Sequence, residues 1–397
     1  MSVMSEKNIA VIGAGILGLS VARSLARQGA KITIFERSHI GAGTSTTSFA
    51  WINSNGKEPL SYHLLNSAAI DEHLKLQQDA KSTARWLIKS GTYEWASNDA
   101  DRQRLDQRAQ RLIELNYPAR KVLPKDLQTN IPEIRLDPLA GDIWHFPSEC
   151  LLYPSLFLAR LWSEARDYGA RLEINSEVVD VKENSGGATL KLADGRSWRG
   201  DIVVLATGRW SQELMLPLGQ PLAMIDANQA GEIACGFLAY TQPQLVQLQA
   251  NLITPGLNIR PEGGGRLLLQ SLDLDNRADP SFPPPVTGFI GQEMLRRLRR
   301  RFDNTDHAQI ERIAVGQRSR PADGLPAIGY VTPLRRVYLM VTHSGITLAP
   351  LLGRLCAEEL LAEKRSPLLK DFSPERLLGK TAADFPALST LHYPAAQ

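Results

Sequence analysis

The chain has 397 residues, of which 43% are hydrophobic and 22% are charged, and its formal net charge is +3. This composition is typical of a globular protein of one large or two smaller domains, and the small charge gives no reason to expect nucleic-acid binding. Three widely spaced cysteines, Cys150, Cys235 and Cys356, match neither a disulfide framework nor a metal site. No signal-peptide pattern and no apolar stretch of about 18 residues is present, so we expect a cytoplasmic, soluble protein without a transmembrane segment.

Residues 8–37 predict a strand, a glycine-rich turn, an amphipathic helix and a second strand. The turn has the spacing Gly-x-Gly-x-x-Gly, and Glu36 ends the second strand 18 residues after the last glycine. In this setting the pattern indicates a dinucleotide site, because the helix N-terminus faces a pyrophosphate and the acidic side chain binds a ribose diol. The charge of Glu36 disfavours NADP. We assign to this part of the cofactor site Gly13, Gly15, Ile16, Leu17, Gly18, Glu36 and Arg37.

The following segments do not continue as a plain NAD-binding domain, which would alternate regularly between strands and helices. Residues 41–51 are small and polar, 62–90 and 101–116 have helical spacing, and 122–150 are Pro-rich and irregular. Residues 177–208 predict a small antiparallel run and then a buried strand that ends in Ala-Thr-Gly. This arrangement resembles flavoproteins with two dinucleotide-binding domains, in which the Ala-Thr-Gly turn approaches the same FAD. A disulfide reductase would need a second glycine fingerprint and a redox cysteine pair, and neither is visible.

The region from 222 to 315 has a mixed pattern that includes a predicted hairpin around Gly263–Gly265. After a Pro-rich linker, the basic run 295–302 predicts a helix with a solvated face, whose inward side carries Met294, Leu295, Leu298 and Phe302.

The chain closes with an apolar strand up to Val341, a tight turn built from His343, Ser344 and Gly345, and a helix. A strand, a tight turn and a helix in this order point backbone N–H groups at a ligand.

Taken together, these motifs resemble the D-amino-acid oxidase / glycine oxidase / sarcosine oxidase family of FAD-dependent amine oxidoreductases. The resemblance covers nearly the full length and rests on the glycine turn with Glu36, on "GAGTSTTS", on "VVLATGRWS" and on "RSRPADGLPAIG" (318–329). It implies an α/β protein with a two-dinucleotide-binding-domain FAD fold and an inserted substrate domain on an antiparallel sheet. The expected FAD-binding domain is 1–85, 146–219 and 312–397, and the expected substrate-binding domain is 86–145 and 220–311.

The resemblance also implies where the rest of the cofactor lies. The backbone of Val178 is expected at the adenine end, and Gly345, Ile346 and Thr347 are expected at the flavin pyrimidine. Backbone N–H donors there would stabilise the negative charge that a reduced flavin gains. The further cofactor residues that we expect are Thr44, Ser45, Thr46, Val178, Thr207, Gly208, Trp210, Ser344, Gly345, Ile346 and Thr347.

Two arginines are candidates for binding a substrate carboxylate. In the family pattern the carboxylate-binding arginine lies five residues before an aspartate, and Arg318 stands at that distance from Asp323. A guanidinium presents two parallel donors, which suits a carboxylate. If the family pattern is aligned on the Arg-Pro dipeptide instead, the carboxylate-binding residue is Arg320. A further alternative is that Arg318 forms a structural ion pair.

Other side chains are weaker candidates. His343 is expected at the flavin end of its turn, where it either contacts substrate, with a catalytic role like that of Arg318, or fixes the loop backbone. Tyr240 and Arg260 are candidates for substrate binding, and His145 lies at the border of the predicted substrate domain. For each of these three an ordinary structural role is the alternative.

Two departures from the family pattern bear on the chemistry. Sarcosine oxidases attach flavin through a cysteine near the segment of Arg318, and this chain has no cysteine within 35 residues of it. We therefore expect noncovalent FAD. Those oxidases also carry a lysine that promotes the reaction with oxygen, whereas no lysine occurs between Lys191 and Lys364. The electron acceptor is then either oxygen or a quinone-type acceptor, with oxygen expected to react slowly.

The expected reaction is oxidation of an amine substrate, an amino acid or N-alkyl amino acid, by hydride transfer to flavin N5, giving an imine that water hydrolyses. Oxidation of a 2-hydroxy acid on the same scaffold is an alternative. A further alternative is that the chain is a flavin-containing subunit of a hetero-oligomer. No metal site is expected.

Overall fold

The computed structural model describes residues 7–80, 83–136 and 141–388. At its centre lies a six-stranded sheet whose neighbours all run parallel, except for the antiparallel pair at one edge. Several of its strands are continuous apolar runs, as expected where both faces of a sheet are covered. The strand order is β19 (Ala327–Tyr330), β20 (Val337–Val341), β13 (Ile202–Leu205), β1 (Asn8–Ile12), β2 (Lys31–Phe35) and β9 (Arg171–Glu173).

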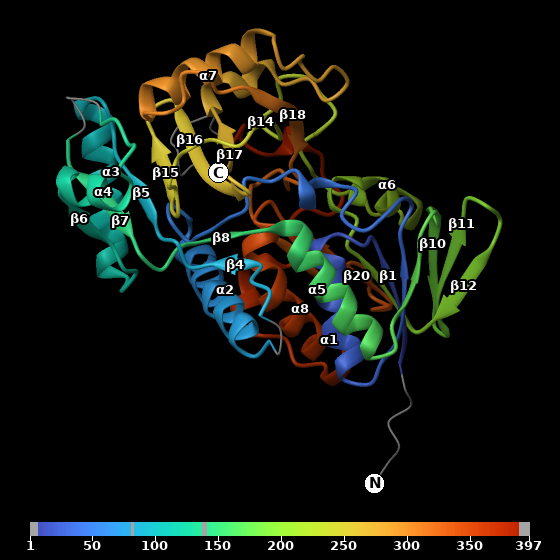
Figure 1. The fold of residues 1–397 in the computed structure, drawn as a ribbon. Coiled ribbons are helices and arrows are strands. Elements are labelled where there is room, and N and C mark those ends of the chain that lie inside the picture. The colour runs from blue at the N-terminus through green and yellow to red at the C-terminus, as the bar shows by residue number, and fades with distance from the viewer. Residues whose placement is uncertain (1–6, 81–82, 137–140, 389–397) are drawn as a thin grey trace.

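Helices cover one face of this sheet and a smaller sheet covers the other. Figure 1 shows four helices lying against the parallel strands. The buried side chains of these helices and strands form one apolar cluster. On the opposite face, a three-stranded antiparallel sheet packs through residues such as Val181 and Leu190. The helices are α1 (Ile16–Arg27), α2 (Leu60–Gln78), α5 (Pro154–Asp167) and α8 (Gly345–Ala362), and the strands are β10 (Val178–Asn184), β11 (Gly187–Leu192) and β12 (Ser197–Gly200).

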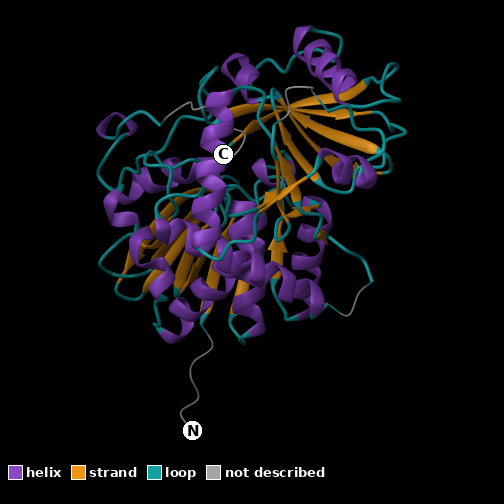
Figure 2. Cartoon of the chain, turned by 90° about the vertical axis from the view of Figure 1, so that its left-hand side faces the viewer, coloured by secondary structure: helices purple, strands orange, loops and turns teal. Residues whose placement is uncertain are grey.

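A second, eight-stranded sheet combines strands from two distant parts of the chain, and Figure 2 shows it fanned out above the parallel sheet. All its neighbours are antiparallel except β5 and β15. The inserted antiparallel sheet expected from the sequence is therefore confirmed. Its order is β18 (Ile310–Gln317), β14 (Cys235–Thr241), β17 (Arg266–Gln270), β16 (Leu257–Gly263), β15 (Asn251–Thr254), β5 (Thr92–Glu94), β7 (Ile143–Phe146) and β6 (Arg120–Val122).

Several local predictions are confirmed in this region. The hairpin around Gly263–Gly265 joins β16 to β17. The Arg-rich helix is α7 (Phe289–Arg301), and the inward residues Met294, Leu295 and Leu298, with Phe302 just after the helix, are buried against the large sheet.

Two predictions differ from the structure. The helix expected over 62–90 ends at Gln78, because residues 87–88 pair as a strand with a partner far along the chain. The segment 122–150 is more regular than its prolines suggest, since its short strands find partners distant in sequence. The elements involved are β3 (Trp51–Ile52), β4 (Leu87–Ile88), β8 (Cys150–Leu152) and α4 (Pro124–Asn130). The helix expected over 101–116 is confirmed as α3 (Asp99–Glu114).

The remaining elements are short helical turns. Within the described ranges, no helix combines the length and apolar character needed to cross a bilayer. The short elements are η1 (Thr44–Thr46), η2 (Gly208–Trp210), α6 (Ser211–Met215), η3 (Leu216–Leu218), η4 (Leu272–Arg277), η5 (Pro367–Phe372), η6 (Pro374–Arg376) and η7 (Ala382–Asp384).

Candidate active site

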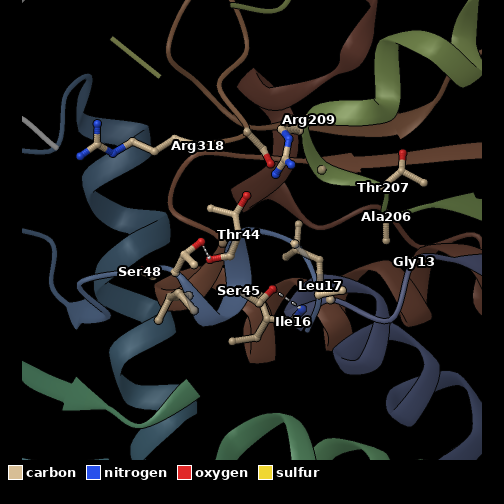
Figure 3. Close-up of a pocket in the computed structure, with 18 of the residues that line it drawn as sticks. Gly13, Ile16, Leu17, Thr44, Ser45, Ser48, Ala206, Thr207, Arg209 and Arg318 are labelled. Carbon is tan, nitrogen blue, oxygen red and sulfur yellow. Dashed lines mark hydrogen bonds between the residues drawn. The ribbon is translucent and has the colours of Figure 1, made fainter. Parts of the chain in front are cut away.

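A cavity of about 430 Å³ lies at the carboxyl edge of the parallel sheet. Its walls come from the turns that follow β1, β2, β13 and β20, together with residues of the eight-stranded sheet such as Gly236 and Gln270. Open α/β sheets bind ligands at this edge, because helix N-termini and loop backbones converge there. In Figure 3, Gly13, Ala206 and Thr207 lie on one side of the cavity and Ser48 on the other.

The glycine turn brings α1 and the backbone close together. Gly13 has φ +100°, and a Cβ there would lie 2.7 Å from the carbonyl oxygen of Ala206. A Cβ on Gly18 would lie 1.9 Å from the carbonyl oxygen of Gly13, so this glycine serves packing and does not line the cavity. Gly15 is different, because a Cβ there would approach only the Ser45 hydroxyl, at 3.2 Å. The backbone at Gly15 is thus open to a ligand at the N-terminus of α1.

Glu36 is held rigidly at the end of β2. Its Oε2 accepts a hydrogen bond from the backbone N–H of Ala14 at 2.8 Å, and its Oε1 accepts one from Ser38 at 2.9 Å. The residue is buried and lines the cavity. These bonds fix the carboxylate beside the glycine turn, where a ribose diol could donate to it.

The hydroxyl-rich run 44–48 closes over the glycine turn. The backbone N–H of Ile16 donates to Ser45 Oγ at 3.0 Å, a contact visible in Figure 3. The Thr44 hydroxyl donates to the carbonyl of Gln317, and both Thr44 and Ser45 line the cavity. Thr46 does not line it, since its hydroxyl donates instead to the carbonyl of Gly41 at 2.9 Å.

Trp210 forms one wall of the cavity together with two arginines. The Arg37 guanidinium carbon lies 3.8 Å from the centre of a Trp210 ring, and that of Arg209 lies 3.7 Å from it. Burial and the charge of Arg37 lower the pKa of Arg209 to about 10. Val178, Thr207 and Gly208 also line the cavity in this region.

The opposite part of the cavity is built by the turn between β20 and α8. Ser344, Gly345, Ile346 and Thr347 all line it. A Cβ on Gly345 would lie 3.8 Å from the Ile16 side chain, so the two helix N-termini are neighbours although they stand at opposite ends of the chain. The Tyr62 hydroxyl and Ser344 Oγ, 2.6 Å apart, tie the turn to α2.

His343 lies in the same turn and faces several cations. Burial, and then the charges of Arg320, Lys57 and Arg318, hold its pKa well below the usual range. Its imidazole is therefore neutral at physiological pH, and it can donate or accept a hydrogen bond without adding charge.

The two candidate arginines have different surroundings. Arg318 lines the cavity, but its Nη2 donates to Asp275 Oδ2 at 3.2 Å and its Nη1 donates to the carbonyl oxygens of Ile233 and Cys235. Arg320 has no ion pair or side-chain hydrogen bond within the described residues, and its Nε is buried without a partner. Burial, followed by the charge of Arg318, lowers the pKa of Arg320 to about 10. Arg320 does not itself belong to the cavity wall, although Ser319 does.

Three other sequence candidates lie away from the cavity wall. Tyr240 is buried on β14 under the guanidinium of Arg312, whose central carbon is 3.6 Å from the ring centre. Arg260 is buried on β16 and pairs with Glu262 at 2.5 Å. His145 stacks on Tyr93 with ring centres 4.4 Å apart. The structure does not bring these residues together with Arg318 and His343.

Comparison with known proteins agrees with this geometry. Residues 8–359 match the DAO family model, described as FAD dependent oxidoreductase. This chain belongs to the DAO family of FAD-dependent oxidoreductases. It is 24% identical over 390 residues to glycine oxidase of Geobacillus kaustophilus, covering 95% of this chain and 99% of that protein. It is also 24% identical to an opine oxidase subunit of Agrobacterium tumefaciens, covering 96% of this chain and all of that protein.

Solved structures show the same fold. The crystal structure of the Geobacillus kaustophilus glycine oxidase aligns with a TM-score of 0.80 at 21% identity, over 94% of this chain and 99% of that one. Iminodiacetate oxidase from Chelativorans aligns with a TM-score of 0.78 at 21% identity, over 92% of this chain and 99% of that one. The expected fold class is confirmed.

The cavity of this DAO-family protein fits FAD. Gly15 leaves the N-terminus of α1 accessible to a pyrophosphate, and the fixed Glu36 carboxylate lies beside it. At the other end, the N-terminus of α8 offers backbone N–H groups, and an N-terminal helix dipole stabilises negative charge. When bound, FAD would supply a two-electron acceptor at this end.

Sequence reasoning missed two ionisable residues in this region. Lys57 is buried and lines the cavity. Glu149 is fully buried, and it accepts hydrogen bonds from Trp51 Nε1 at 2.7 Å and from the Tyr117 hydroxyl at 3.0 Å. No spacing in the sequence links these two residues, because the pairing of β3 with β8 brings their segments together.

Proposed function

We propose that the protein oxidises the amine of an amino acid or N-alkyl amino acid, giving an imine that water hydrolyses. The observation that carries this proposal is Arg320, a cation whose Nε is buried without a hydrogen-bond partner and whose charge acts on His343 in the turn before α8. A guanidinium left without a counter-ion favours a carboxylate ligand. The names of its relatives, which include glycine oxidase and opine oxidase, support a substrate of this class.

Each part of the chain has a separate role in this proposal. The turns at Gly15 and Gly345 would hold FAD, which would supply the acceptor for the hydride from the carbon beside the nitrogen. Backbone N–H groups at Gly345 and beyond would stabilise negative charge on the bound cofactor. The arginine orients the substrate through its carboxylate, and the neutral His343 can contact the substrate without opposing a cationic amine. We propose that 1–85, 146–219 and 312–397 bind the cofactor, and that 86–145 and 220–311 cover the substrate.

We favour Arg320 over Arg318 as the carboxylate-binding residue. The Arg318 guanidinium is already bound to Asp275 and to two carbonyl oxygens, so its charge and most of its donors are in use. This is the structural ion pair that was the alternative for Arg318, with Asp275 as the acid. Arg320 has no comparable partner in the described part of the chain.

We propose that FAD is bound noncovalently. Cys150, Cys235 and Cys356 are all buried, and none of them lines the cavity. The electron acceptor, oxygen or a quinone-type molecule, stays open. Lys57 puts an amino group in the cavity from a segment outside 191–364, so the absence of lysine from that stretch gives no reason to expect a slow reaction with oxygen. A cytoplasmic location also stays a prediction.

An anaerobic substrate screen tests the proposal. Bleaching of the flavin absorbance would be followed with amino acids, N-alkyl amino acids and 2-hydroxy acids under identical conditions. Reduction by amino acids and not by hydroxy acids is the expected result. Reduction by hydroxy acids alone would replace the proposal with its alternative. Inactivity of the isolated chain together with copurification of a second protein would favour a role within a hetero-oligomer, which the name of the opine oxidase relative also suggests.

A further inference from the structure

Lys57 stands in the cavity next to the proposed site of oxidation. It lies in the loop between β3 and α2, it is 9% exposed, and Trp51 and Asn53 from the same segment line the cavity with it. Its Nζ lies 5.9 Å from the ring centre of Tyr62, whose hydroxyl bonds to Ser344 in the turn before α8. Lys57 is thus placed beside the turn where the substrate's nitrogen would react.

The proposed oxidation requires a group that accepts a proton from the substrate. An amino acid is present in water mostly with its nitrogen as an ammonium, which has no lone pair to assist departure of a hydride from the adjacent carbon. The ammonium must therefore lose a proton before the hydride can leave. His343 is a poor acceptor, because burial and three neighbouring cations disfavour its protonation. The amine of Lys57, which is buried beside the turn, is a better proton acceptor.

We propose that Lys57 accepts the proton from the substrate's ammonium nitrogen, and this inference rests on the proposed function. In this step an N–H bond of the substrate breaks, its electron pair stays on the substrate nitrogen, and a new N–H bond forms on the neutral Nζ of Lys57. No electrons are exchanged with the cofactor in the step, so its balance needs no further reactant.

The charges around Lys57 suit this role. Four groups from other elements act on it or share its surroundings: Arg320 after β18, Glu149 before β8, His343 before α8 and Tyr62 on α2. Burial, then the charge of Arg320, lowers the pKa of Lys57 to about 8, while Glu149 acts in the opposite direction. Folding therefore makes a neutral lysine accessible near physiological pH.

The same arrangement couples substrate recognition to base strength. A substrate carboxylate bound at Arg320 neutralises the cation that depresses the pKa of Lys57. The lysine then becomes a stronger base at the moment when an amino acid is bound. A simple amine without a carboxylate leaves Arg320 unneutralised and Lys57 a weaker base, so the pair favours amino acids over amines.

Rapid anaerobic reduction of the FAD-loaded enzyme by its best amino acid, measured from pH 6 to 10, tests the inference. The wild-type reduction rate should rise with pH through an ionisation near pH 8. Both Lys57→Met and Lys57→Arg should lose this ionisation and slow reduction by about 100- to 10,000-fold, as expected when a general base is removed. The exposed Lys125→Met is the matched control and should behave as wild type.

A second readout does not depend on turnover. An α,α-disubstituted amino acid such as 2-methylalanine has no hydrogen to transfer, and its binding can be followed by the flavin spectrum. At pH 7 the free ligand's ammonium and the Lys57 ammonium each carry a proton that can be lost, and in the complex the two nitrogens keep only one of these protons. The wild type should therefore release about one proton per ligand bound, and Lys57→Met should release none.

Three outcomes would overturn the inference while leaving the proposed function intact. Lys57→Arg could keep the wild-type reduction rate, which would mean that the site needs a charge and not a base. Both variants could be reduced normally and be slow only in reoxidation, which would assign Lys57 to the electron acceptor. Proton release could be unchanged in Lys57→Met. If the wild-type enzyme is reduced by no amino acid, the proposed function itself fails.

Discussion

The guanidinium of Arg318 binds the carboxylate of Asp275, with 3.2 Å between Nη2 and Oδ2, although 43 residues separate them. Asp275 Oδ1 also accepts the backbone N–H of Phe237, so the pair joins β18 and β14 to the η4 turn. Burial raises the pKa of Asp275, and Arg318 opposes that rise. The arginine that the sequence favoured for substrate thus already neutralises a buried acid.

Alanine substitutions should distinguish the role of Arg318 from that of Arg320. Arg320→Ala should lower kcat/KM about 30- to 4000-fold, because losing one partner of a charged pair in a closed site costs roughly 2–5 kcal/mol. Its thermal stability should stay near that of wild type. Arg318→Ala should instead destabilise the protein by about 3 kcal/mol, since Asp275 is left without its counter-ion. Steady-state kinetics and thermal unfolding of both variants measure the contrast.

The conservative replacement Arg320→Lys serves as the control and should recover only part of the activity, because an ammonium lacks the two parallel donors of a guanidinium. If Arg318→Ala loses kcat/KM with unchanged stability while Arg320→Ala is normal, the carboxylate contact belongs to Arg318. If neither change affects turnover of the true substrate, that substrate has no carboxylate at this position.

Glu36→Gln should weaken FAD binding without changing the fold. The amide keeps one acceptor oxygen, but it loses the negative charge and one of the bonds from Ala14 or Ser38. Charge-assisted hydrogen bonds contribute about 1.5–3 kcal/mol, so the Kd for FAD should rise about 10- to 100-fold. Fluorescence titration of the apoprotein measures it, with the exposed Glu114→Gln as control. An unchanged Kd would remove Glu36 from the cofactor site.

The flavin should separate from the denatured protein. The purified protein should be yellow, and acid or heat should release its FAD, because the buried Cys150, Cys235 and Cys356 do not reach the cavity wall. Absorbance of the supernatant after precipitation is a sufficient measurement. Flavin that stays with the precipitated chain would contradict noncovalent binding, and protein that cannot be reconstituted with FAD would contradict the cofactor itself.

Lys57→Met should stabilise the folded protein at neutral pH. The pKa of Lys57 is about 8 in the folded state and 10.5 for the ordinary side chain, so the unfolded chain binds more protons between these values. Wild-type stability therefore rises with pH across this window, and the penalty for the buried charge is largest below pH 8. The Tm difference between variant and wild type should be largest near pH 7 and small near pH 10. A difference independent of pH would contradict the lowered pKa.

Local patterns were sufficient to predict much of the wall of the cavity. The glycine turn and Glu36 lie within one strand–helix–strand unit, and hydrophobic spacing together with turn chemistry determines that unit. The same holds for the turn from His343 to Gly345, whose neighbouring strand and helix follow one another directly.

The part of the cavity around Arg318 and Lys57 was harder to predict, because its contacts are distant in sequence. Nothing near Arg318 indicates that Asp275 will bind it, and nothing near Lys57 indicates Glu149 or Arg320. Tyr240 and Arg260 lie on strands that are buried on both faces over much of their length, so alternation could not show which side each residue faces.

The order of the central sheet also has a consequence for biosynthesis. β1 lies beside β13, and β13 lies beside β20, so the first strand made needs partners that the ribosome produces much later. The turn at Gly13 is complete early, but its neighbour at Gly345 emerges only with the last sixth of the chain. A nascent chain can therefore present the phosphate-binding turn and still lack the wall that encloses the flavin ring. We therefore expect stable capture of the cofactor only after the segment that carries Gly345 has folded beside the glycine turn.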